Sequence, residues 1–201
     1  MTTKTKFVFV LHNHQPIGNF DVVFAKAYEK SYLPYLEVIE RRESFRFGLH
    51  ISGPLLEWLE ANQPKYLDRI AELADAGRVE MLGGAFYEAI PIMLADRDRK
   101  AQFEMMNEYI ERRFGKRPTG LWLAERVWEQ SVAHDIASCG LKYTLLDDHH
   151  FKLAGIPASR LNGYFYAEDR GSSIAVFPIC EKLRYMIPFA QPEETIAYLE
   201  K

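Results

Sequence analysis

The stretch Thr119-Gly-Leu-Trp-Leu-Ala-Glu125-Arg126-Val-Trp128-Glu129 decides the fold, because it joins a short apolar run to a polar end. The run Leu121 to Ala124 is continuously apolar, as expected for a strand that is covered on both faces. A helical pattern precedes it and stops at Gly115, a residue type that commonly ends helices. This order of helix, glycine and short buried strand is typical of parallel α/β organisation.

The same order recurs along the chain. Predicted strands are the short apolar runs Phe7 to His12, Phe45 to Ile51, Val79 to Leu82, Leu121 to Ala124, Tyr143 to Leu146 and Ile174 to Ile179. Helical patterns lie between them, at Phe24 to Ile39, Leu67 to Leu73, Phe103 to Ile110 and Val132 to Ile136. No linker interrupts the chain, so we expect one domain over residues 1–201. A closed (β/α) barrel typically needs about 250 residues, so we expect the N-terminal part of a barrel that lacks at least one strand.

Composition excludes several classes of protein. The 201 residues are 48% hydrophobic with a net charge of -3, and the charges are mixed along the chain. This balance predicts neither a nucleic-acid partner nor a membrane partner. No run resembles a signal peptide or a membrane span, so we expect a cytoplasmic protein. We expect no cofactor and no bound metal, and the sequence points to no particular oligomeric state.

Two histidines lie at and just after the end of the first predicted strand. Residues two apart share a face of a strand, so Val8, Val10, His12 and His14 fall on one side. They would reach the carboxyl mouth of a barrel, where barrel enzymes hold their active sites. A histidine pair at this spacing is more often a hydrogen-bonded pair than a metal site.

The same alternation places carboxylates at the mouth. Leu121, Leu123 and Glu125 share one face, and so do Glu80 and Leu82, which directs both carboxylates toward one cavity.

Neighbouring side chains leave several interpretations open. Trp122 has the opposite parity and reaches the cavity only where the strand twists or breaks. Trp122 and Trp128 are candidates for sugar stacking, although most tryptophans belong to the core. The run Asp147-Asp148-His149-His150 can ligate a metal, bind sugar hydroxyls or cap the next segment. Glu80 and Glu125 can also be plain ion-pair residues.

Several separated motifs resemble one family in the right order. The stretches Leu11-His-Asn-His-Gln-Pro-Ile-Gly-Asn19, Gly77-Arg-Val-Glu80 and Trp122-Leu-Ala-Glu125-Arg-Val resemble the first three signatures of glycoside hydrolase family 57, the retaining α-glucan amylases and glucanotransferases. Three further stretches are similar to its 4-α-glucanotransferase branch, namely Ser52-Gly-Pro-Leu-Leu-Glu57-Trp58, Ala85-Phe-Tyr-Glu88 and Glu181-Lys-Leu-Arg-Tyr-Met-Ile-Pro188.

The resemblance implies a fold and a chemistry. The fold is an incomplete, TIM-like (β/α)7 barrel with parallel strands, and this chain ends before the seventh strand. Glu125 matches the nucleophile, and an aspartate beyond Lys201 would be the general acid. The substrate is an α-1,4-glucan or maltooligosaccharide. We expect its binding residues to be His12, His14, Gln15, Glu80, Trp122, Arg126, Asp148 and His150, with Arg126 holding Glu125 ionised.

Two other functions stay open. A metal-dependent carbohydrate deacetylase would hold a divalent ion with His12, His14 and one of Asp147 or Asp148. A catalytically incomplete glucan-binding fragment would retain Glu125 without using it.

Overall fold

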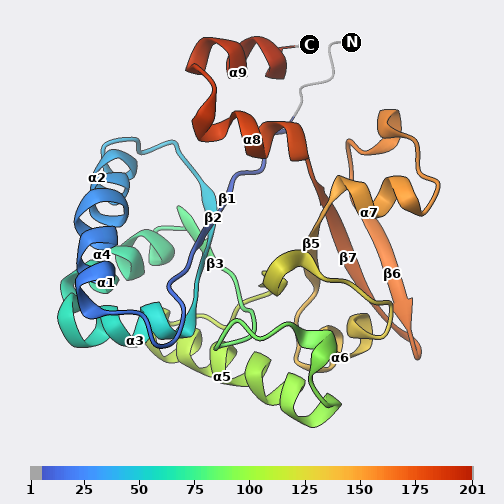
Figure 1. The fold of residues 1–201 in the computed structure, drawn as a ribbon, viewed down its shortest axis with the longest axis horizontal. Coiled ribbons are helices and arrows are strands. Elements are labelled where there is room, and N and C mark those ends of the chain that lie inside the picture. Colours follow the sequence, from blue (N-terminus) through green and yellow to red (C-terminus); the bar gives the residue numbers. More distant parts are fainter. Residues whose placement is uncertain (1–5, 201) are drawn as a thin grey trace.

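The chain alternates short strands and helices throughout residues 6–200, the part that this computed structural model describes (Figure 1). The strands are β1 Val10–Asn13, β2 Phe47–Ile51, β3 Val79–Met81, β4 Gly120–Leu121, β5 Tyr143–Asp147, β6 Phe165–Asp169 and β7 Ser172–Ile179. The α-helices are α1 Asp21–Ala27, α2 Leu33–Glu40, α3 Gly53–Asn62, α4 Pro64–Asp75, α5 Asp96–Phe114, α6 Val132–Ser138, α7 Asp148–Leu153, α8 Glu181–Phe189 and α9 Pro192–Leu199.

The strands form one parallel arc. The order is β1-β2-β3 in one sheet and β4-β5-β7-β6 in the other, and every pair except β7 with β6 is parallel. A parallel bridge between Gly83 and Leu121 joins the two sheets, and the N–H of Trp122 donates to the carbonyl of Gly83 at 2.9 Å. The predicted fold class, a partial TIM-like α/β barrel with parallel strands, is confirmed. The six predicted strands are all present, although β1 begins three residues later than expected.

β6 departs from the predicted parallel pattern. It pairs antiparallel with β7 through a two-residue turn, Arg170-Gly171. Both residues have positive φ, 49° and 75°, which the favoured two-residue hairpin turns require. The six predicted strands all lie parallel, whereas β6, a strand that the sequence analysis did not predict, is antiparallel because a tight turn can join only antiparallel strands.

Two apolar cores support the arc. One lies between β1–β3 and helices α1–α4, on the left of Figure 1, and the other surrounds β4, β5, β7 and α6. In α3, Leu55, Leu56 and Leu59 are fully buried, and each such side chain contributes about 1.5–3 kcal/mol. Gly115 ends α5 in the left-handed conformation (φ 75°), as its position predicted. Within residues 6–200 no helix combines the length and apolarity that a membrane crossing requires.

Parallel strands bring their carboxyl ends to a common edge. The residues that follow β1, β3, β4 and β5 therefore converge, although they are far apart in the sequence. This edge holds the candidate site.

Candidate active site

The site begins with two histidines on neighbouring strands. The parallel register of β1 and β2 places His12 beside His50, and their Nδ1 atoms lie 2.9 Å apart, within hydrogen-bonding distance. The ring of Trp122 stacks on His12 with centroids 4.6 Å apart and planes 15° apart. Because β4 ends at Leu121, Trp122 leaves the strand alternation and joins the site. Its ring packs against an imidazole, so only 8% of the residue is exposed.

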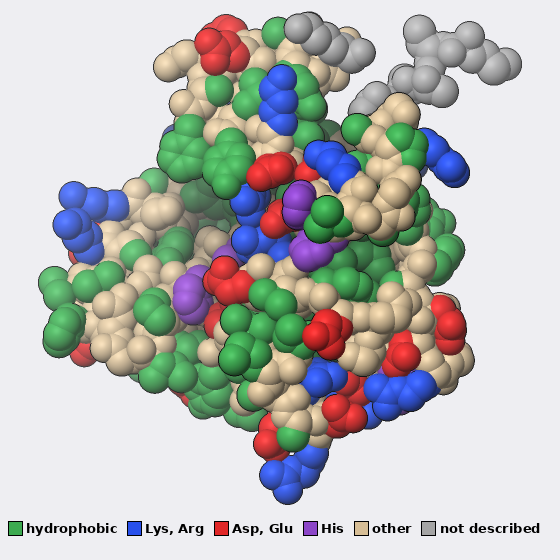
Figure 2. Space-filling model, turned by 45° about the vertical axis from the view of Figure 1, so that its right-hand side comes forward, with side chains coloured by type: hydrophobic (Ala, Val, Ile, Leu, Met, Phe, Trp, Pro, Cys, Tyr) green, Lys and Arg blue, Asp and Glu red, His purple; other side chains and the backbone are tan. Residues whose placement is uncertain are grey.

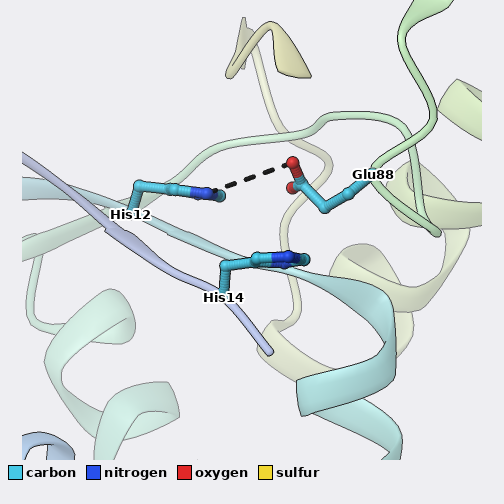
Figure 3. Close-up of side chains that lie close together, drawn as sticks. All are labelled: His12, His14 and Glu88. Carbon is cyan, nitrogen blue, oxygen red and sulfur yellow. Dashed lines mark ion pairs between the residues drawn. The ribbon is translucent and has the colours of Figure 1, made fainter. Parts of the chain in front are cut away.

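His14 lies two residues beyond His12, and the two rings are nearly parallel (Figure 3). Their centroids are 5.7 Å apart and their planes differ by 10°. The prediction that both histidines share one side of the chain is therefore confirmed. Burial lowers the pKa of His12 to about 4 and also lowers the pKa of His14. Both imidazoles are consequently neutral near pH 7.

The carboxylate that faces the histidines is Glu88, from the loop after β3. Its Oε1 lies 3.5 Å from Nδ1 of His50, and its Oε2 lies 4.0 Å from Nε2 of His12 (Figure 3). Burial, followed by the charge of Glu125, raises the pKa of Glu88 to about 7. Ligand atoms of His12, His14 and Glu88 lie within 4.8 Å of one another, so this cluster can offer a metal ion three ligands.

Replacing Glu88 by Gln should remove a pH dependence from the stability of the chain. The raised pKa means that the folded state binds more protons than the unfolded state between about pH 4.5 and about pH 7. Measured against E88Q, the free energy of unfolding of the wild type should therefore fall by about 3 kcal/mol across that interval, and the difference should level off above it. The lowered pKa values of His12, His14 and His50 act in the opposite direction in both proteins, so they cancel in this difference. Urea unfolding of wild type and E88Q from about pH 4 to about pH 8 measures the difference.

The matched control for this experiment is Glu129→Gln, since Glu129 is exposed. Its pH profile should follow that of the wild type. Parallel profiles for wild type and E88Q would contradict a raised Glu88 pKa.

Glu80 does not lie at this site, and the prediction that placed it there is wrong. Its exposed carboxylate accepts hydrogen bonds from the hydroxyls of Thr119 (3.0 Å) and Tyr143 (2.8 Å), at the amino ends of β4 and β5. Glu80 pairs with Gly48, two residues before His50, and two residues span about 6.6 Å along a strand. Only the loop after β3 reaches the level of the histidines.

A turn, rather than a strand, presents Glu125. The strand predicted from Leu121 to Ala124 ends at Leu121, and Ala124–Arg126 form a short 3₁₀ turn. Within it Glu125 and Arg126 have φ of 51° and 54°. The strand alternation therefore stops before the carboxylate, and the shared face predicted for it does not explain its position.

Glu125 nevertheless lies beside the histidine cluster. Its negative charge opposes the lowering of the His14 pKa and adds to the raising of the Glu88 pKa. The side chain is exposed. Figure 2 shows acidic, basic and histidine side chains gathered around a hollow in this face of the molecule. An accessible carboxylate beside neutral imidazoles is thus available to a ligand in solution.

Arg126 pairs with a different carboxylate from the one predicted. Its Nε lies 3.0 Å from Oδ2 of Asp147, at the end of β5, and its guanidinium lies 5.6 Å from the ring centroid of Trp122. Arg184 of α8 approaches the other oxygen of Asp147 at 3.5 Å. Among the ion pairs of residues 6–200, Arg126 has Asp147 and not Glu125 as its partner. The pair connects the β4 turn to β5.

Three other predicted binding residues lie along the same edge but outside the cluster. The amide of Gln15 donates to the hydroxyl of Tyr32 at 3.1 Å. Asp148 pairs with Lys152 at 2.8 Å, one turn further along α7, and His150 belongs to the same helix. Across the described part of the chain, no hydrogen bond or ion pair links these three side chains to the catalytic candidate.

The predicted deacetylase ligand set is not assembled. Asp147 and Asp148 are paired with basic side chains, so neither joins His12 and His14 as a third ligand. The carboxylate that does lie beside both histidines is Glu88.

The sequence interpretation missed His50 and the role of Glu88. Glu88 closed the stretch Ala85–Glu88, which resembled the glucanotransferase branch, and it follows two glycines in a loop, where functional residues concentrate. His50 gave no such signal, because it sits inside the apolar run Phe47–Ile51 and reads as a core residue.

Comparisons with known proteins identify the family of the chain. Residues 8–201 match the family model described as glycosyl hydrolase family 57. The chain is 46% identical over 100% of its length to alpha-amylase 1 of Dictyoglomus thermophilum, and 43% identical over 98% of its length to 4-alpha-glucanotransferase of Thermococcus litoralis. It covers 29% and 30% of those two proteins, which is less than a third of each.

Solved structures give a similar fold. The crystal structure of the Thermococcus litoralis 4-alpha-glucanotransferase superposes with a TM-score of 0.95, covering 98% of this chain and 31% of that one at 43% identity. A family 4 carbohydrate esterase from Streptomyces lividans shares the fold alone, with a TM-score of 0.50 and 11% identity over 73% of this chain and 66% of that one. The chain belongs to glycosyl hydrolase family 57.

Proposed function

We propose that residues 1–201 form the N-terminal part of the catalytic barrel of a retaining enzyme that acts on α-1,4-glucans, a 4-α-glucanotransferase or an α-amylase. The observation that carries the proposal is the exposed carboxylate of Glu125, set on a turn after β4 and beside the His14 and Glu88 side chains. The named relatives, an alpha-amylase and a 4-alpha-glucanotransferase, support this substrate class.

The proposed mechanism is a double displacement on Glu125. Its carboxylate attacks the anomeric carbon, the glycosidic bond breaks, and a general acid gives its proton to the leaving oxygen. In the second step water or a sugar hydroxyl attacks the anomeric carbon of the glycosyl-enzyme and gives a proton to the residue that acted as general acid. The bond to Glu125 breaks, and its carboxylate is free again. Retention requires the two carboxyl groups to lie about 5–5.5 Å apart. By the family pattern, the acid is an aspartate that follows Lys201.

The other residues of the site would hold the sugar. Neutral His12 and His14 each offer one ring nitrogen as donor or acceptor to a hydroxyl group. Trp122 fixes the ring of His12 by stacking on it. The Arg126 guanidinium, held by Asp147, keeps the turn that carries the nucleophile against β5.

Incubation of the protein extended past Lys201 with maltotriose tests the proposal, with products resolved by chain length. Glucans both longer and shorter than the substrate indicate a glucanotransferase, whereas shorter sugars alone indicate an amylase. The 201-residue chain should be inactive beside it, because it supplies the nucleophile without the acid. Unchanged maltotriose with the extended protein would contradict the proposal.

A metal-dependent carbohydrate deacetylase is the second candidate, because three ligand atoms from His12, His14 and Glu88 lie within 4.8 Å of one another. Stoichiometric zinc in the purified extended protein, together with release of acetate from an acetylated oligosaccharide, would favour it. Binding of maltooligosaccharide without turnover by the extended protein would instead favour a glucan-binding module.

The cytoplasm stays the location predicted from the sequence.

A further inference from the structure

His50, on β2, is fully buried and contacts the site through His12. Its Nδ1 lies 2.9 Å from Nδ1 of His12. Its Nε2 is buried and has no hydrogen-bond partner among residues 6–200. The backbone packs closely against that atom, since a Cβ added to Gly84 would lie 2.5 Å from it. The ring is therefore fixed in place with only one nitrogen engaged.

This arrangement selects one tautomer for each histidine. Burial lowers the pKa of His50 as it does that of His12, so both rings are neutral. Two neutral imidazoles hold a single hydrogen between their Nδ1 atoms. If His12 donated that hydrogen, His50 would carry its own on Nε2, as a buried N–H without an acceptor. An orphaned buried donor is rare and costs about 1–3 kcal/mol. If His50 donates instead, its Nε2 is a bare lone pair, which is tolerated better.

The consequence for His12 is that it carries its hydrogen on Nε2. That atom faces Oε2 of Glu88 at 4.0 Å, which is too long for a hydrogen bond (Figure 3). A hydroxyl group between them, about 2.8 Å from each atom, would accept from Nε2–H and donate to the carboxyl group. A metal ion needs a bare nitrogen, so this tautomer disfavours ligation by His12.

We propose that His50 is a positioning residue that holds His12 as an Nε2–H donor, so that one hydroxyl of the transferred glucose bridges His12 and Glu88. The hydroxyl bridge rests on the proposed function, because it assumes a sugar substrate. The assignment of the tautomers rests only on the contacts of the two histidines.

The tautomers can be measured without activity. The chain contains six histidines, few enough for each ring to be resolved by long-range proton–nitrogen NMR after histidine-specific nitrogen-15 labelling. We expect hydrogen on Nε2 of His12 and on Nδ1 of His50. Hydrogen on Nδ1 of His12, or stoichiometric zinc binding that moves the His12 signals, would overturn the proposal.

Kinetics of the extended protein test the positioning role and the bridge. His50→Leu removes the donor, whereas His50→Asn keeps an N–H close to the Nδ1 position. With maltotriose we expect kcat/KM to fall on the order of 10-fold in H50L, as for one lost hydrogen bond, and to recover largely in H50N. Thr144→Val is the matched control, because Thr144 is also fully buried and donates to a backbone carbonyl on the neighbouring strand. Equal losses in H50L and T144V would reduce His50 to a structural residue.

Deoxy substrates, each lacking one hydroxyl group of the glucose that is transferred, identify the hydroxyl that bridges His12 and Glu88. One of them should lose on the order of 10-fold in kcat/KM with the wild type, and should lose no more with Glu88→Ala, because the two changes remove the same contact. Additive losses for every deoxy substrate would overturn the bridge. If the wild type turns over no α-glucan, the proposed function fails and the bridge fails with it, while the NMR measurement still decides the tautomers.

Discussion

Glu125→Gln in the extended protein is expected to lower kcat for maltotriose by at least about 10⁴-fold, because the amide oxygen cannot displace the leaving sugar. The exchange preserves the shape of the side chain, so the positive-φ turn that presents it should be unchanged. Product formation is measured by chain length over time. Calorimetric titration with maltotriose should give nearly the affinity of the wild type, which would show that only the chemical step is lost.

The control for this variant is Glu129→Gln, an exposed glutamate four residues further along. It should retain the activity of the wild type. Retention of activity within tenfold by E125Q would mean that the nucleophile lies elsewhere, with Glu88 as the next carboxylate to test.

Asp135→Asn is expected to destabilise the chain by about 3–5 kcal/mol, because it removes the buried counter-charge of a buried guanidinium. The other carboxylate near this guanidinium, Asp96, is 3.6 Å away and 64% exposed. The Asp135 side chain is fully buried in α6, and its Oδ2 accepts a hydrogen bond from Nη1 of Arg99 in α5. Lys100 approaches the other oxygen at 3.3 Å. The same guanidinium also donates to the carbonyls of Pro91 (2.8 Å) and Leu94 (3.1 Å). Urea unfolding gives the free-energy difference.

An exposed ion pair on α5 provides the contrast. Asp98 pairs with Arg97 at 3.0 Å, but the two side chains are 52% and 90% exposed, so Asp98→Asn should change stability by less than about 0.5 kcal/mol. Replacing both buried partners, as in Arg99→Met with Asp135→Leu, should recover most of the loss. A loss below about 1 kcal/mol in D135N would show that the buried pair does not hold the two helices together.

The sequence predicted the parts of the site that depend on the periodicity of side chains within one strand or helix. Two-residue alternation placed His12 and His14 together, and glycine signals located the ends of the helices, Gly115 among them. These patterns need no knowledge of neighbouring strands. The predicted strand bounds were accurate enough to place the carboxyl edge.

The predictions that failed depended on the register between neighbouring strands, which the sequence does not reveal. Glu80 lies within β3 and Glu88 in the loop after it, and only the pairing of β3 with β2 shows that Glu80 lies two residues below the level of His50. The short β4 likewise ended before the alternation could be carried to Glu125. His50 was invisible because a buried histidine in an apolar strand has the same pattern as a core residue, and its partner lies 38 residues away in sequence.

The backbone at Glu88, Glu125 and Arg126 has a consequence for evolution. Each of these residues has positive φ, between 51° and 56°. For residues other than glycine or asparagine, this backbone conformation typically costs about 1–2 kcal/mol of folding free energy. A lineage selected for robustness alone would drift toward glycine at these three positions. Laboratory evolution toward heat resistance without an activity screen should erode them early, so their persistence in a thermostable descendant would itself be a sign that chemistry was still under selection.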